Sequence, residues 1–335
     1  MNILKKLYLK LNRKYKYLQR DLAGRVGLYN EFYRSARGNR IIIYHGICKK
    51  APLRFNTLFV TEKIFEAHLR FYKKYFQAVS LADFYNNNFS RDRFTVCLTF
   101  DDGFANNHKY VLPLLEKYEI PATFFVTTIR KEGYDILWND LLTISSVKGP
   151  GEIIFENEVF NKNSRNTYVS SITKKTLSET LKESGFDTKK KMMALLKPYT
   201  SFKQVRELDD YWMQMTADEI KEASESPFIT IGSHSCYHND LAKISLTEMT
   251  EELNGSKTFL ENIIHKRVTQ FAFPYGNYSP AVIEEAVKAG YDQLLAAEFI
   301  YPQDKNNSLM KERMGVNPFI SVTNQMLGII NGNYE

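Results

Sequence analysis

Short apolar runs alternate along this chain with longer stretches in which apolar residues recur every three or four positions. The short runs have the length and pattern of buried strands, and they fall at 40–45, 77–80, 94–101, 122–127, 228–233, 269–273 and 293–297. The longer stretches predict helices at 62–75, 106–118, 246–264 and 280–289. Because strands and helices alternate in this way in parallel α/β folds, we expect an α/β chain whose strands form a closed or incomplete barrel.

The pattern changes between about residues 141 and 225, where the chain becomes polar and rich in Lys, Ser and Thr. A helix is expected within it at 178–196. We interpret this stretch as an insertion after the fourth strand that packs beside the mouth of the barrel and shapes a substrate groove. Trp138 stands just before it, where its ring could stack on a sugar or anchor the insertion to the core.

Two adjacent carboxylates end the most regular of the apolar runs. No residue from Phe94 to Phe100 is charged, and Asp101 and Asp102 then follow directly, before Gly103. Two ionised carboxylates side by side repel each other and resist desolvation, so a cation is expected nearby, and a metal ion is the usual one. The alternative is that Asp102 and Gly103 simply form a turn.

Two histidines four positions apart end another apolar run. The chain has six histidines, and His234 and His238 fall together at this strand end. One Asp and two His leave a coordination position for water, which is typical of a catalytic divalent-metal site rather than a closed structural one. The other histidines outside strands are expected to have structural roles; they are His68, His108 and His265.

The run at 271–276, Phe-Ala-Phe-Pro-Tyr-Gly, is a third strand that ends in turn residues. Together with the segments at 99–103 and 234–238, it resembles the NodB-homology polysaccharide deacetylases, carbohydrate esterase family 4. That family carries Thr-Phe-Asp-Asp-Gly, then two histidines in a short His-Ser/Thr motif, then Arg-x-Pro-Tyr-Gly, in the same order. The resemblance covers about residues 40–320.

This resemblance implies a distorted (β/α)7 barrel and a role for each matching residue. Asp101 is expected to be the general base that takes a proton from the attacking water. Asp102, His234 and His238 are expected to bind a divalent metal, with Zn2+ as the expected ion. The backbone N–H of Tyr275 is expected to stabilise the oxyanion.

The chain departs from the family at two points. The Arg that orients the base in the family is Ala272 here, and no histidine follows His265 to supply the general acid. The apolar run that ends at Tyr44 and His45 is similar to an early Tyr-His element in the exopolysaccharide branch of the family. The resemblance therefore implies that His45 protonates the leaving amine; the alternative is a histidine that is hydrogen-bonded at a strand end for structural reasons.

The expected function is removal of N-acetyl groups from amino sugars of a polysaccharide, a surface glycan or a lipid-linked glycan precursor. Two alternatives remain at this point. One is hydrolysis of a different amide on the same barrel. The other is a catalytically silent glycan-binding homologue, which Ala272 and the missing late histidine favour, whereas a base beside an intact metal triad speaks against silence.

Residues 1–38 form a separate basic segment before the catalytic domain expected at 39–335. The first 20 residues carry seven Lys and Arg and no acidic residue, and leucines and tyrosines recur on one helical face. The segment lacks the apolar core and cleavage site of a signal peptide, and no stretch is long enough to span a membrane. A helix of this kind either lies on an anionic membrane or is a solvated helix docked on the barrel; no nucleic-acid motif accompanies the charge.

Composition agrees with one catalytic domain, because 335 residues with 44% hydrophobic content suffice for a large core. The three cysteines are scattered and odd in number, which favours reduced thiols in a cytoplasmic protein rather than a disulfide framework; they are Cys48, Cys97 and Cys236. The expected location is therefore cytoplasmic, with peripheral association at the inner face of the cell membrane. Cys236 lies between the two ligand histidines, but we do not expect it to bind the metal.

Overall fold

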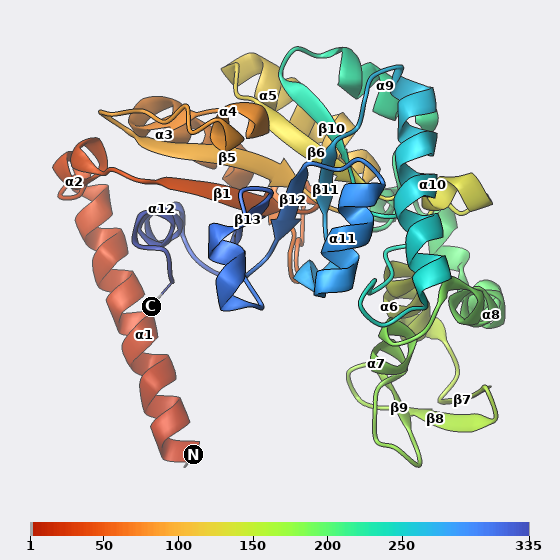
Figure 1. Cartoon of the computed structure of the whole chain (residues 1–335). Helices are drawn as coiled ribbons and strands as arrows, with labels where there is room; N and C mark the ends of the chain where they lie inside the picture. Colours follow the sequence, from red (N-terminus) through yellow and green to blue (C-terminus); the bar gives the residue numbers. More distant parts are fainter. Residues whose placement is uncertain (1–2, 335) are drawn as a thin grey trace.

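A parallel β-sheet curled into a nearly closed barrel forms the centre of the computed structural model, which describes residues 3–334 (Figure 1). Its strands lie in the order β13-β12-β11-β10-β6-β5-β1-β14. The short strand β4 pairs with the first half of β5, at residues 94–96, and β6 pairs with the second half, at residues 98–100. They are β1 (Asn39–Tyr44), β4 (Phe76–Ala78), β5 (Phe94–Phe100), β6 (Ala122–Val126), β10 (Ile229–Ser233), β11 (Gln270–Ala272), β12 (Gln293–Ala296), β13 (Met310–Glu312) and β14 (Met314–Gly315). The predicted α/β barrel is confirmed.

The two edges of the sheet are joined by one short stretch of chain. β13 pairs with β12, and β14 pairs with β1, so residues 310–315 cross from one edge to the other. A single residue, Arg313, separates these two strands. We call residues 310–315 the seam. The seven predicted strands are present within two residues, whereas the seam strands were not predicted, because two or three residues carry no detectable alternation.

Helices cover the outside of the barrel (Figure 1). Two of them, α3 (Glu62–Tyr75) and α10 (Leu246–Ile264), coincide with the predictions, and α11 (Pro280–Lys288) is one residue shorter. The predicted helix at 106–118 begins as a π-turn over Asn107–Val111 and continues as α5 (Leu112–Tyr118). Pro113 has no N–H to give to the preceding turn, which accounts for the irregular register. The remaining helices here are α2 (Asn30–Ser35), α4 (Leu81–Tyr85), α9 (Ala217–Glu225) and α12 (Val322–Asn331).

The insertion has its own hydrophobic core. It contains α6 (Trp138–Lys148), a three-stranded antiparallel sheet of β7 (Glu152–Phe155), β8 (Glu158–Lys162) and β9 (Tyr168–Ser170), and then α7 (Leu177–Lys182) and α8 (Phe186–Leu196). The single helix expected at 178–196 is two helices, because the chain breaks at Ser184 and Gly185, where Gly185 caps α8. Trp138 is fully buried in this core, so it anchors the insertion and has no free face for a sugar.

Helix α1 (Ile3–Arg25) precedes the barrel and extends away from it, with its last turns beside α12 (Figure 1). No helix within residues 3–334 is both long and apolar enough to cross a membrane.

Candidate active site

The carboxyl ends of four barrel strands bring the expected site residues to one place. Tyr44 pairs with Phe100 across β1 and β5, so His45 emerges level with Asp101. Phe100 pairs in turn with Phe124 of β6, whose neighbour β10 ends just before His234. Tyr275 follows the next strand, β11. Parallel strands therefore place the predicted residues at the same edge of the sheet, as in other barrels.

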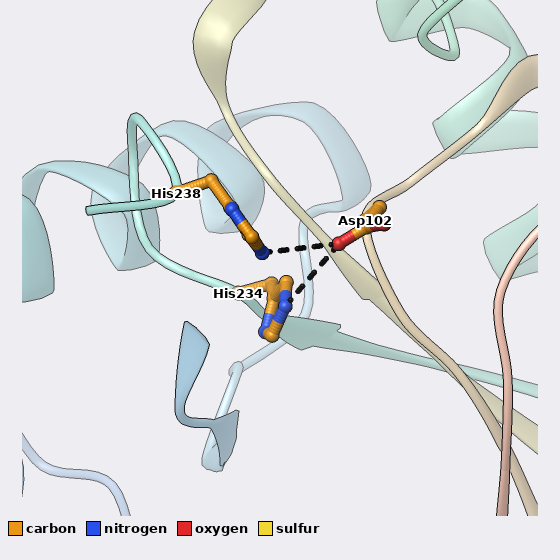
Figure 2. Close-up of side chains that lie close together, drawn as sticks. All are labelled: Asp102, His234 and His238. Atoms are coloured by element: carbon orange, nitrogen blue, oxygen red, sulfur yellow. Dashed lines mark ion pairs between the residues drawn. The ribbon is translucent and has the colours of Figure 1, made fainter. Parts of the chain in front are cut away.

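Asp102, His234 and His238 form a compact buried triad (Figure 2). Asp102 Oδ1 lies 3.2 Å from His238 Nε2 and 3.5 Å from His234 Nε2. One ligand atom from each residue lies within 4.8 Å of the others, and no other such group of three is found among the described residues. This donor set, one carboxylate and two imidazoles, is the one that Zn2+ and similar divalent ions prefer.

The surroundings of the triad fit a cation. His234 Nδ1 lies 2.8 Å from the carbonyl oxygen of Ala272, so it donates its proton there and leaves Nε2 with its lone pair toward Asp102. Asp102 Oδ1 is buried and accepts no hydrogen bond within the described chain. Burial opposes ionisation of Asp102, but His238 and His234 outweigh it and hold its pKa well below the usual range. An ionised carboxylate oxygen that lacks a hydrogen bond and lies between two imidazoles is a suitable binding site for a cation.

The backbone around the triad is held in an uncommon conformation. Asp102, His238 and Tyr275 have φ of 75°, 54° and 60°, which non-glycine residues rarely adopt. Neighbouring contacts hold the first of them, since the Thr127 hydroxyl donates to the Asp102 carbonyl. The carboxylate of Glu252 accepts the two N–H groups of residues 236 and 237, between the histidines. Such strain costs about 1–3 kcal/mol per residue and clusters at functional sites.

Arg313 is a site residue that the sequence analysis missed. Its guanidinium makes two parallel hydrogen bonds to Asp101, of 2.7 Å and 2.8 Å, and a third of 3.1 Å to the Thr99 hydroxyl. Both members of the ion pair are buried. Although burial raises the pKa of Asp101, the Arg313 charge, with smaller contributions from His234 and His45, lowers it below the usual value. Asp101 is therefore kept ionised and fixed in orientation.

His45 is partly buried and lies close enough to both carboxylates to lower the pKa of Asp101 and Asp102. Its ring makes no hydrogen bond with any residue of 3–334. The alternative of a histidine fixed at a strand end by a structural hydrogen bond therefore gains no support. The side chain stands near the base and the triad, where a proton donor would be needed.

Tyr275 lies against the triad through both its backbone and its ring. Its hydroxyl donates to the His238 carbonyl at 3.2 Å, and the two rings are 4.5 Å apart. Its own N–H has no acceptor in the described structure. The aromatic contact fixes the turn that presents this N–H, and the free N–H is available to a ligand.

Asp140, on the first turn of α6, is a further buried carboxyl at this site. One of its oxygens has no hydrogen-bond partner in the described part of the chain. Burial and the nearby charge of Asp102 raise its pKa well above the usual range. Two residues earlier, the Trp138 indole donates to the His238 carbonyl at 3.4 Å, so the start of α6 packs directly on the ligand loop.

A cavity of about 870 Å³ shares two lining residues with the site, Tyr275 and Arg313, whereas Asp101, His45 and the triad do not line it. Its other lining residues are Arg40, Lys305 and residues 276–277, 297–300, 312, 314–315 and 332–334.

Comparison with known proteins identifies the family. The model for the polysaccharide deacetylases matches residues 90–157 and 188–294, which together make up more than half of the chain. The chain belongs to the polysaccharide deacetylase family. The gap between the two matched parts falls within the insertion that separates β6 from β10.

One curated relative, from Bacillus subtilis (strain 168), carries the name "Putative polysaccharide deacetylase YxkH", and this chain matches less than a third of its length. It is 27% identical over 84 residues, which are 25% of this chain and 30% of the relative. Among solved structures, the deacetylase PplD of Streptococcus pyogenes, in complex with acetate, matches with a TM-score of 0.56 and 18% identity, over 87% of this chain and 97% of that one. The polysaccharide deacetylase BC0361 of Bacillus cereus matches with a TM-score of 0.55 and 19% identity, over 87% and 68%. These likenesses establish the fold.

In this family member, the position of the base-orienting Arg is filled by Ala272, which is fully buried. The cation comes instead from Arg313 on the seam. Its side chain lies over the Phe125 ring at 5.4 Å, inside the barrel. The three cysteines are free and buried, and Cys236 is not part of the triad: its thiol lies 3.4 Å from the Glu252 carbonyl.

Proposed function

We propose that this chain is a metal-dependent hydrolase that removes N-acetyl groups from amino sugars of a polysaccharide, a surface glycan or a lipid-linked glycan precursor. The observation that carries the proposal is the pairing of a tethered base with a cation site. Asp101 is held ionised by Arg313, directly beside a triad whose donor atoms all face one point. Family membership supports the same chemistry.

Asp102, His234 and His238 would hold the metal, with Zn2+ as the expected ion. When bound, such an ion polarises the acetyl carbonyl and makes water easier to deprotonate. The residues of the chain divide the remaining work. Asp101 accepts the proton of the attacking water, and Arg313 keeps that carboxylate unprotonated until it does so.

The second half of the reaction needs a hydrogen-bond donor for the oxyanion and a proton donor for the leaving amine nitrogen. The free N–H of Tyr275 donates a hydrogen bond to the developing oxyanion. His45 then gives a proton to the departing amine, because an amine leaves poorly as an anion. Bond changes balance: the C–N bond breaks, a C–O bond forms, and acetate and a free amino sugar are released.

The silent glycan-binding alternative loses part of its support. It drew on the absence of Arg at position 272, and Arg313, between β13 and β14 on the seam, supplies the missing cation. A binding protein would also have little use for an ionised carboxylate buried beside a metal site, since that arrangement is costly to maintain.

We also propose that the enzyme works in the cytoplasm. The three cysteines are buried free thiols, spread over separate elements of the fold, as is usual for proteins of a reducing compartment.

The test is acetate release from a panel of N-acetylated oligosaccharides and lipid-linked N-acetyl sugars by the zinc-loaded protein. Asp101→Asn serves as the inactive control, because it preserves shape but removes the base. We expect release from at least one amino sugar, and none from the variant. Release by neither protein from any member, with the metal bound in both, would favour the silent alternative.

A further inference from the structure

Helix α1 carries an exposed apolar stripe. Five of its residues are between 54% and 67% exposed and recur at alternating steps of three and four; they are Tyr8, Leu11, Tyr15, Leu18 and Leu22. At about 100° per residue, these positions lie on one face of the helix. Isolated exposed leucines are ordinary, but five on one face of one helix form a continuous surface that water covers unfavourably.

The stripe is not the face by which α1 is attached. The Tyr17 hydroxyl donates to the Tyr334 carbonyl, and Asn324 of α12 donates to the Asp21 carboxylate at 2.8 Å. Gly24 lies against Thr323, with no room for a side chain between them. These three α1 positions lie on the side of the helix turned away from the stripe. The helix is therefore fixed in place with its apolar side outward.

Basic residues border the stripe on both sides. By the same helical geometry, Lys14 and Arg25 lie beside the stripe on one side, and Lys5 and Lys16 lie farther round the helix on the other flank, opposite to Asp21; all four are exposed. The first 25 residues carry eight Lys and Arg and one acidic residue, Asp21, which is occupied by its contacts with α12. An apolar strip between two rows of cations matches the surface of an anionic bilayer, where acyl chains lie beneath negative headgroups.

We propose that α1 docks the enzyme onto an anionic lipid bilayer, with the stripe in the headgroup region and the cations against the lipid phosphates. A second copy of the chain is the other candidate occupant, since the spacing also suits a paired helix. Pairing of two α1 helices would bring two sets of eight cations close together, and their repulsion would cost energy. An anionic bilayer would instead neutralise these cations. Charge thus favours lipid. This inference does not depend on the proposed catalytic activity.

The test is sedimentation of the full chain with vesicles of phosphatidylcholine alone or mixed with phosphatidylglycerol. We expect binding only to the mixed vesicles, with a steep decrease as salt rises. The variant Leu11→Glu/Leu18→Glu/Leu22→Glu should lose binding at least tenfold. Its matched control, Ile154→Glu/Ile172→Glu/Val287→Glu, changes three exposed apolar residues outside α1 and should bind as the parent does.

A charge variant keeps the stripe and removes its borders. Lys5→Gln/Lys14→Gln/Lys16→Gln should weaken binding roughly a hundredfold, since each cation at an anionic surface contributes on the order of 1 kcal/mol. Circular dichroism checks that each variant is folded. Parent protein that stays in the supernatant, or a stripe variant that still binds, overturns the proposal. Light scattering that shows a dimer in the parent and a monomer in the stripe variant would assign the surface to a second copy instead.

Discussion

Arg313 and Asp101 are 212 positions apart in the sequence and form a bidentate ion pair inside the barrel. The pair joins the two parts of the chain that the candidate chemistry needs: the strand end that carries the base and the seam that closes the sheet. A buried charge that loses its partner typically costs 3–5 kcal/mol. One side chain therefore links the stability of the barrel to the ionisation of its base.

Arg313→Met should lower both stability and activity. Asp101 has a lowered folded pKa, so its contribution to stability is present above the unfolded pKa of about 3.9 and is lost as pH falls through the folded value. Without the guanidinium that pKa rises, so the acid limb of the rate profile should move to higher pH. The free energy of unfolding at neutral pH should fall by about 3–5 kcal/mol. Urea denaturation and pH profiles of kcat/KM measure the two effects.

Arg313→Lys is the matched control, since it keeps the charge but not the two parallel hydrogen bonds. Its acid limb should lie between those of the parent and of Arg313→Met. An acid limb that stays in place in Arg313→Met would mean that Arg313 supports the fold alone.

The triad assignment predicts a coupled loss of metal and activity. His234→Ala/His238→Ala should remove bound zinc, because one carboxylate cannot hold it, and turnover should fall with occupancy. Elemental analysis of the purified protein measures the metal. His108→Ala, a change at a partly buried surface histidine paired with Glu222, should retain it. Stoichiometric metal in the double variant would disprove the assignment.

Substitutions of the two neighbouring aspartates should have different effects on metal binding and on turnover. Asp101→Asn should keep the metal and the fold while turnover drops at least 10²-fold, the usual effect of losing a general base. Asp102→Asn should lose the metal. Measuring zinc content and acetate release on both variants decides the matter, and the reverse pattern would exchange the two roles.

His45→Gln should reveal which group protonates the amine. Turnover of an N-acetyl sugar should fall far more than turnover of an activated aryl acetate, whose leaving group needs little help. Asp140→Asn is the comparison, because Asp140 is the other carboxyl of the site without a complete set of partners. If only Asp140→Asn discriminates between the two substrates, Asp140 is the acid and His45 is structural.

Asp140 also predicts a pH dependence of stability with the opposite sign to that of Asp101. Its folded pKa is raised, first by burial and then by Asp102, so keeping it in place costs nothing below pH 4 and more as pH rises above the unfolded value. In metal-free protein, Asp140→Asn should therefore be more stable than the parent by an amount that grows from pH 4.5 to 7.5. Urea denaturation at the two pH values measures it; a constant difference would contradict this reading.

Much of the barrel could be predicted because its strands are buried on both faces. β5 and β6 consist of uncharged residues that are all buried, and such runs are visible in the sequence alone. Asp101 and Asp102 follow the carboxyl end of β5, so strand prediction and family motif pointed to the same edge. The helix that ends at Ile264 could be placed from its apolar periodicity, and a capping box of Ser245 and Glu248 begins it in the structure.

Arg313 could not be predicted for a physical reason. A salt bridge between residues far apart in sequence leaves no local pattern, and the strands on either side of Arg313 are too short to show alternation. The antiparallel sheet of the insertion was missed for a related reason. Its strands bury only part of their surface, and Ile154 is 65% exposed between two buried neighbours. The sequence of these strands therefore mixes polar and apolar residues in the way that loop sequences do.

The seam also gives the barrel a particular order of assembly. Contacts of long sequence separation form late, because the chain must close a large loop before they are gained. During synthesis, Asp101 is made long before Arg313, and its carboxylate has no guanidinium until residues 310–315 join β12 to β1. A chain that has not yet closed its sheet therefore lacks a tethered base. Closure of the barrel and tethering of the candidate base are therefore coupled, so partly folded chains should lack the proposed hydrolase activity.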